Sequence, residues 1–242
     1  MKIYAANIAP LYENEIFRKY CDSVDSVRLS QVLRTGTRDG KVRSLVAGYL
    51  LQTGVREQLE EQTGSSVSKW DPIPLSYSYG VNGKPAFAQR EGKICRQLSV
   101  TWDRLLQPHF NLSHSGRYVV CGFHGEEIGV DIQEQSDCRP GVAKRFFTGE
   151  ECALLQACGT EQARVELFFQ MWTVKESYIK LTGWGMKQGL DTFQIDWKEQ
   201  CIREKGGEIQ AYFWQQTYGE NYRICVCTRK RQEKLCIKTI RL

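Results

Sequence analysis

Hydrophobic residues recur with the period of a helix in two long stretches of this chain of 242 residues. In the first, residues 42–50, apolar side chains stand at positions i, i+3, i+4, i+7 and i+8, which is typical of an amphipathic helix. The second covers about residues 164–181. A shorter helix is predicted to begin at the capping box formed by Thr148 and Glu151 and to end at Gly159.

Two neighbouring runs, 118–123 and 128–132, have the residue types of β-strands. The short polar segment 124–127 between them predicts a hairpin. Alternate positions of the second run are apolar, so these side chains share one face of the strand. Asp131 and Gln133 then lie side by side on the other face.

The clearest break in the pattern is at Gln107–Pro108. Prolines and a tight turn at Asn82–Gly83 precede it, and a denser alternation of predicted elements follows it. We therefore expect two parts, an N-terminal half of residues 1–108 and a C-terminal half of residues 109–242.

Composition describes a globular, soluble chain, with 41% hydrophobic and 25% charged residues. The N-terminus lacks the apolar stretch of a signal peptide, and no run approaches the roughly 20 apolar residues that span a bilayer. We expect a cytoplasmic protein whose ten cysteines are reduced and mostly buried. No C-x-x-C or H-x-x-x-H spacing supports a zinc site.

Glu176 lies on the apolar stripe of the predicted helix over residues 164–181, four residues after Trp172 and three before Ile179. A buried carboxylate is costly unless a cation or a metal pairs with it. Lys175 and Lys180 place positive charge beside it. The alternative is that drift in the helical register exposes the carboxylate to solvent.

Asp131, Gln133 and Glu176 together offer the oxygen ligands that a hard cation prefers, which favours magnesium over zinc. Basic residues near position 40, together with Lys84, would suit a phosphorylated substrate. The alternative for each basic residue is a solvated surface position. The basic residues near position 40 are Arg34, Arg38, Lys41 and Arg43.

The segment 110–116 is interpreted as a polar turn between apolar elements. It contains Ser113, His114 and Ser115, but neighbours in a turn rarely adopt the hydroxyl-to-imidazole geometry that nucleophilic catalysis needs. Anion binding by His114 is the favoured interpretation. A hydrogen-bonded loop histidine is the alternative.

Three sequence segments, 110–116, 128–132 and 172–180, occur in an order that resembles the motifs of the 4′-phosphopantetheinyl transferases of the Sfp type. Residues 83–85 and 144–147 resemble two further stretches of that family. The resemblance covers about residues 28–193. It implies two similar α+β halves related by pseudo-twofold symmetry, in a monomer with coenzyme A bound in the cleft between them.

The resemblance also implies residue roles in the C-terminal half. Asp131 and Glu176 match the magnesium-binding acids of the family, with manganese as the alternative cation. Gln133 stands where a third acidic ligand is usual, and an amide oxygen adds no negative charge. Lys175 and Lys180 match the two lysines beside Glu176, and both are expected to contact coenzyme A. Glu176 would be the general base, Lys180 would stabilise the departing phosphate, and Asp131 completes the catalytic set.

In the N-terminal half, the resemblance implies contacts to the nucleotide end of coenzyme A, with His114 on the 3′-phosphate. The matching positions are Arg28, Arg43, Ser44, Lys84, Pro85, Ser113 and His114. The implied reaction transfers 4′-phosphopantetheine to a serine of an apo acyl or peptidyl carrier protein and releases adenosine 3′,5′-bisphosphate. The segment after the predicted helix over residues 164–181, with Trp184, Met186 and Lys187, is expected to meet the carrier. The alternative for Trp184 is a core position.

Two other functions fit parts of the sequence. The net charge of +5 and aromatic residues near basic ones would suit an RNA-binding protein, but the charge is small and no nucleic-acid module is recognisable. A magnesium-dependent nucleotide hydrolase could use the same acids without any carrier. We therefore expect coenzyme A and a carrier protein as partners, and neither nucleic acid nor a membrane.

Overall fold

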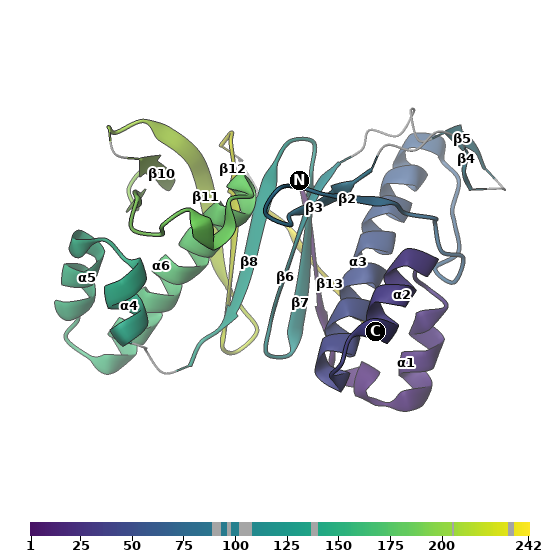
Figure 1. The fold of residues 1–242 in the computed structure, drawn as a ribbon, viewed down its shortest axis with the longest axis horizontal. Coiled ribbons are helices and arrows are strands. Elements are labelled where there is room, and N and C mark those ends of the chain that lie inside the picture. Colours follow the sequence, from purple (N-terminus) through teal and green to yellow (C-terminus); the bar gives the residue numbers. More distant parts are fainter. Residues whose placement is uncertain (89–92, 96–97, 102–107, 137–139, 205, 232–234) are drawn as a thin grey trace. The chain divides into compact units, whose positions relative to one another are not determined.

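The computed structural model describes the whole chain except residues 89–92, 96–97, 102–107, 137–139, 205 and 232–234 (Figure 1). It consists of two compact units, one of Met1–Gly125 with Cys236–Leu242 and the other of Glu126–Leu235. The division after Gly125 differs from the predicted break at Pro108. The reason is strand pairing, since the strands of residues 109–124 belong to the sheet of the first unit.

The first unit contains a long helix, α3, that packs on a four-stranded sheet. Thr37 caps the start of α3, where its hydroxyl accepts a hydrogen bond from Gly40 N, and Gly64 ends the helix in the left-handed region at φ 67°. The predicted helix over residues 42–50 is confirmed and is longer than its hydrophobic pattern. The helices are η1 (Ala9–Tyr12), α1 (Asn14–Cys21), α2 (Ser26–Arg34) and α3 (Arg38–Thr63).

The four-stranded sheet has the order β13-β1-β7-β6, in which only the β1–β13 pair is parallel. Side chains of α3 and of this sheet form the core of the unit, with Tyr4, Leu45, Leu50 and Phe110 among its largest buried members. The strands are β1 (Lys2–Asn7), β6 (His109–Ser115), β7 (Tyr118–His124) and β13 (Ile237–Ile240), and two separate hairpins are β2 (Tyr77–Tyr79) with β3 (Pro85–Phe87) and β4 (Lys93–Cys95) with β5 (Leu98–Thr101).

The second unit is a five-stranded antiparallel sheet with the order β8-β12-β11-β10-β9. Its longest helix, α6, lies against β8 and β12, and α5 packs on α6 (Figure 1). The strands are β8 (Ile128–Glu134), β9 (Phe193–Asp196), β10 (Cys201–Glu204), β11 (Ile209–Tyr218) and β12 (Tyr222–Thr228), and the helices are α4 (Pro140–Phe146), α5 (Gly149–Gln156), α6 (Glu161–Thr182) and η3 (Gly185–Lys187).

Gly129 brings the backbones of β8 and α6 into direct contact. A Cβ atom at this position would lie 1.9 Å from the carbonyl oxygen of Ser177 and 2.5 Å from the nitrogen of Leu181. Only glycine can therefore occupy this place without moving the helix. The contact sets the distance between the strand that carries Asp131 and the helix that carries Glu176.

Several expectations about local structure are corrected. The runs 118–123 and 128–132 are strands, but they do not form a hairpin, because β7 pairs with β1 and β6 while β8 pairs with β12. Residues 110–115 lie in strand β6, and the turn follows it at Gly116. The capping box of Thr148 and Glu151 is confirmed, yet α5 ends at Gln156 rather than at Gly159.

The α+β class is confirmed, since both units combine helices with antiparallel strands. In the described part of the chain no helix is long and apolar enough to cross a membrane. Cys121, Cys201, Cys225 and Cys227 are buried free thiols, as expected, whereas Cys236 is exposed.

Candidate functional site

Asp131 is a buried carboxylate at the centre of a polar group in the second unit. Its side chain is 1% exposed. Lys180 Nζ donates to Asp131 Oδ1 at 2.5 Å, and Gln133 Nε2 donates to Oδ2 at 3.0 Å. Both carboxylate oxygens therefore have a protein donor, one of them charged.

Glu176 is electrostatically part of the same group. Burial raises the pKa of its carboxyl from an ordinary 4.5 to about 7, and the negative charge of Asp131 raises the pKa further, while the positive charge of Lys180 lowers it. Glu176 is half-buried, so the solvent-exposed alternative for this acid does not hold. A carboxyl with a pKa near 7 can exchange a proton under neutral conditions.

The local structure explains why these four side chains meet. Glu176 and Lys180 are four residues apart on α6, so they occupy the same face of the helix. Asp131 and Gln133 are alternate residues of β8 and occupy the same side of the strand. The close backbone contact at Gly129, two residues before Asp131, brings this side of β8 near α6.

The ligand set fits a hard cation with few protein ligands. It offers two carboxylates and one amide, all oxygen donors, and contains no thiolate. As the side chains stand, Gln133 turns its NH2 group toward Asp131, and rotation of the amide would present its oxygen instead. Among the residues that the structure describes, no group of three or more histidine, cysteine, aspartate or glutamate side chains could hold a metal. With two carboxylates and one amide as protein ligands, an octahedral cation here would take its remaining ligands from waters or substrate oxygens.

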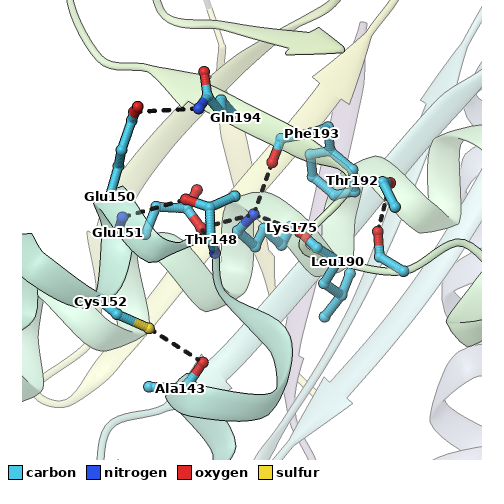
Figure 2. Close-up of polar contacts among 11 residues, drawn as sticks. Ala143, Thr148, Glu150, Glu151, Cys152, Lys175, Leu190, Thr192, Phe193 and Gln194 are labelled. Carbon is cyan, nitrogen blue, oxygen red and sulfur yellow. Dashed lines mark hydrogen bonds and ion pairs between the residues drawn. The ribbon is translucent and has the colours of Figure 1, made fainter. Parts of the chain in front are cut away.

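Lys175 does not belong to this group, although it precedes Glu176 in the sequence. Its side chain is fully buried, and its ammonium contacts Glu151 Oε2 at 2.9 Å, Leu190 O at 2.6 Å and Phe193 O at 3.1 Å (Figure 2). An ammonium has three hydrogens to donate, and all three have acceptors. The contact to coenzyme A expected of Lys175 is therefore not supported, because neither its charge nor its hydrogens are available to a ligand.

The sequence analysis did not predict the partner of Lys175. Glu151 was recognised only as the third residue of a helix start, where its carboxylate accepts a hydrogen bond from Thr148 N at 2.9 Å. The same oxygen, Oε2, also pairs with Lys175. Burial lowers the pKa of Lys175, whereas the charge of Glu151 acts in the opposite direction. A lysine and a glutamate on different helices leave no local pattern by which this pairing could have been found.

Residues expected to contact a nucleotide lie in the first unit. Arg43 and Ser44 are in the second turn of α3, and Arg43 donates to the carbonyl of Gly116 at 3.2 Å, which ties the helix to the β6–β7 turn. Arg43 also pairs with Asp39 at 2.9 Å, and its side chain remains 28% exposed. The turn of β6–β7 and the start of α3 are therefore close to each other.

Arg28 is held in place by several neighbours. The carboxylate of Asp25 caps α2 by accepting from the backbone of Arg28 at 3.0 Å, and the Arg28 guanidinium lies 5.2 Å from the centre of the Tyr77 ring. On α3, a Cβ atom at Gly48 would come within 2.4 Å of Arg28 Cγ. The stem of this arginine thus passes directly over a glycine of the neighbouring helix.

The last four candidates lie on strands β3 and β6 and the turn before β3. Ser113 is buried on β6, whereas the adjacent His114 is exposed, as alternation along a strand requires. Lys84 precedes β3, and Pro85 is the first residue of that strand. All seven nucleotide candidates are thus in one unit, on α2, α3, the β2–β3 hairpin and β6.

Comparison with known proteins finds 4′-phosphopantetheinyl transferases. A profile of the 4′-phosphopantetheinyl transferase superfamily matches residues 127–227, which contain Asp131 and Glu176. The chain is 40% identical over 195 residues to 4′-phosphopantetheinyl transferase Sfp of Bacillus subtilis strain 168, a match that covers 81% of this chain and 76% of that protein. It is 28% identical over 231 residues to another Bacillus subtilis 4′-phosphopantetheinyl transferase, covering 94% and 92% of the two chains.

Among solved structures, the holo-[acyl-carrier-protein] synthase of Thermotoga maritima matches with a TM-score of 0.31 and 15% identity, over 42% of this chain and 61% of that chain. A match of this size carries no conclusion about the fold. The sequence comparisons are much stronger, because one relative is matched over most of both chains. The chain therefore belongs to the 4′-phosphopantetheinyl transferase superfamily, and it is an enzyme of the Sfp type.

Proposed function

We propose that the enzyme transfers 4′-phosphopantetheine from coenzyme A to a serine of an apo acyl or peptidyl carrier protein and releases adenosine 3′,5′-bisphosphate. The observation that carries this proposal is the group formed by Asp131, Glu176 and Lys180. Asp131 and Glu176 can hold a metal cation, Glu176 can act as the base, and the Lys180 ammonium can bind phosphate. All three residues lie inside the region that the family profile matches. Transfer of a phosphoryl-type group requires these three elements.

Magnesium, or manganese in its place, would be held by Asp131 and Glu176, with Gln133 as a third, uncharged ligand. The raised pKa of Glu176 supports this assignment, since burial and the nearby negative charge of Asp131 both disfavour its ionised form, and the charge of Lys180 only partly offsets them. When bound, the cation supplies charge neutralisation at the pyrophosphate.

Glu176 and Lys180 would do the remaining chemistry. The serine hydroxyl of the carrier gives its proton to the Glu176 carboxylate while its oxygen forms the new bond to phosphorus. The bond from that phosphorus to the oxygen of the departing adenosine bisphosphate breaks, and the Lys180 ammonium stabilises the negative charge left on that oxygen. In the structure Lys180 is bound to Asp131, so substrate phosphate would compete with a carboxylate for this ammonium.

The nucleotide end of coenzyme A would contact Arg28, Arg43, Ser44, Lys84, Pro85, Ser113 and His114. The proximity of Arg43 to the β6–β7 turn supports grouping these residues into one binding surface. We also propose that the two halves are related by pseudo-twofold symmetry and that the enzyme is monomeric and cytoplasmic. Each unit does contain a sheet with mostly antiparallel strands and one long helix packed on it, α3 of 26 residues and α6 of 22 residues.

An acidic carrier would meet the segment that follows α6. Trp184 is 60% exposed in this segment, so it is not the core residue that the sequence left open as an alternative. Lys187 is also exposed and would act mainly on encounter rate. Exposed aromatic side chains often dominate protein interfaces.

The proposed reaction can be tested directly by mass spectrometry of intact carriers. Purified enzyme is incubated with coenzyme A, magnesium and a panel of apo carriers. A mass gain of one phosphopantetheine group, absent from carriers whose acceptor serine is replaced by alanine, is the expected result. Loss of coenzyme A without any modified carrier would instead indicate a hydrolase.

Gln133 allows a finer test of the cation site. Gln133→Glu is expected to lower the magnesium concentration needed for half-maximal activity, because it adds a third negative charge. Without magnesium the same variant should melt at a lower temperature than the wild type, since the new carboxylate faces Asp131. Gln133→Ala should reduce activity far less than Asp131→Ala. Equal losses from the two alanine variants would show that the amide is a full ligand.

His114 allows a test of the nucleotide surface. Its partner in the proposal is the 3′-phosphate, and hydrogen bonds to charged groups are worth about 1.5–3 kcal/mol. His114→Ala should therefore lower the affinity for coenzyme A by roughly tenfold to a hundredfold and the affinity for 3′-dephospho-coenzyme A by much less. Calorimetric titration of both ligands measures this difference. The same loss for both would place His114 away from that phosphate.

A further inference from the structure

Lys175 connects three parts of the second unit through its ammonium group. Its Nζ contacts Glu151 in α5, the carbonyl oxygen of Leu190 just before β9 and that of Phe193, the first residue of β9 (Figure 2). The Nζ also lies 4.5 Å from the centre of the Phe193 ring. Since Lys175 is itself on α6, one side chain joins this helix to α5 and to the chain that enters β9.

The chain that Lys175 holds is the segment between α6 and β9, residues 183–192, hereafter the post-helix segment. Near its start, the hydroxyl of Thr182 donates to Gln188 Oε1 at 2.8 Å, and Gln188 N donates to Gly185 O at 3.1 Å. At its far end the two carbonyls bound by Lys175 fix the return to the sheet. The exposed Trp184 is thus presented on a segment that is anchored at both ends.

Glu151 is needed for this arrangement because a buried ammonium requires a counter-ion. Its side chain is 6% exposed, and its Oε2 accepts from both Lys175 and the backbone of Thr148. Its other oxygen, Oε1, is buried and has no hydrogen-bond partner among the described residues. Glu150 adds a second connection, since it accepts from Gln194 of β9 at 3.2 Å (Figure 2).

We propose that Lys175 and Glu151 are positioning residues, which hold the post-helix segment and its Trp184 in the orientation that a carrier protein recognises. The inference rests on the proposed function, because it assumes that the segment meets the carrier. It gives Lys175 a role in carrier recognition in place of the contact to coenzyme A that the sequence suggested. Glu151 acquires a role beyond capping α5.

Kinetics of Lys175→Met provide the first test. The variant keeps a long unbranched side chain but loses the ammonium and its three contacts. We expect the KM for the carrier to rise by about tenfold, which is the effect of losing one well-placed interface contact. The KM for coenzyme A should stay within about twofold of the wild type. Lys198→Met, the same change at an exposed position of this unit, is the matched control.

A double-mutant cycle with Trp184→Ala shows whether Lys175 changes the carrier KM through Trp184. If Lys175 acts through Trp184, Lys175→Met should add little to the carrier KM once Trp184 is gone. Additive losses, or equal changes in the KM for both substrates, would overturn the proposal. Should Lys175→Met fail to fold, Glu151→Gln replaces it in the cycle, since the glutamine oxygen can still cap α5.

Amide hydrogen exchange tests the inference without any enzymatic reaction. The post-helix segment should exchange faster in Lys175→Met than in the wild type, while the core of the β8–β12 sheet keeps its protection. Unchanged exchange in this segment would refute the positioning role even in an active enzyme. Faster exchange in a protein that modifies no carrier would refute the proposed function and leave the anchoring of the segment established.

Discussion

Asp131→Asn is expected to lower kcat for carrier modification by at least about a hundredfold, the scale found when one ligand or charge donor is removed from an active site. The substitution preserves volume but removes the charge that pairs with Lys180 and would hold the cation. Asp131→Ala should be at least as severe. Single-turnover assays with saturating coenzyme A and magnesium measure this loss.

The protein should remain folded after this change. Lys180 loses its counter-ion, yet its side chain is 26% exposed, so water can solvate the ammonium. Far-UV circular dichroism and a thermal melt provide the check, with Asp22→Asn as the control at an exposed aspartate of the first unit. Near-normal turnover by Asp131→Asn would remove this residue from the cation site.

Glu176→Gln is expected to have two opposite effects. Activity should fall as much as in Asp131→Asn, while the metal-free protein should gain stability. Folding raises the pKa of this carboxyl from 4.5 to about 7. Below an unfolded pKa of 4.5 the acid is protonated in both states and costs nothing. Between pH 4.5 and about 7 the unfolded chain ionises this acid while the folded protein keeps it protonated, so stability falls across this range and levels off above pH 7.

Glutamine is neutral at every pH and removes this cost. The stability gain should therefore stay below about 1 kcal/mol at about pH 5 and reach about 3 kcal/mol at about pH 8. Urea denaturation at both pH values, in the presence of a chelator, measures it, and Glu208→Gln is the control at an exposed site. Magnesium should stabilise the wild type more than the variant. A gain that does not depend on pH would show that Glu176 is not a desolvated acid.

The sequence predicted those features that depend on residues close together in the chain. The periods of α3 and α6, the capping box at Thr148 and the shared face of Asp131 and Gln133 all follow from local spacing. Glu176 stood out for the same reason, because one carboxylate interrupts a short-range pattern.

The features that the sequence missed depend on partners distant in the chain. The runs around β7 and β8 have correct strand patterns, but their partners β1 and β12 lie far from them in sequence, so the predicted hairpin was wrong. Lys175 and Lys180 were both predicted to place positive charge beside Glu176. The structure separates them, because one points to Glu151 and the other to Asp131.

The backbone contact at Gly129 also limits how this enzyme can be altered. Most protein cores absorb a change of volume by repacking side chains, but here main chain meets main chain and nothing can repack. Libraries for new carrier specificity are therefore better directed to exposed positions such as Trp184 and Lys187 than to β8 or the face of α6 that covers it. The strand and the helix would tolerate change in evolution only as a pair.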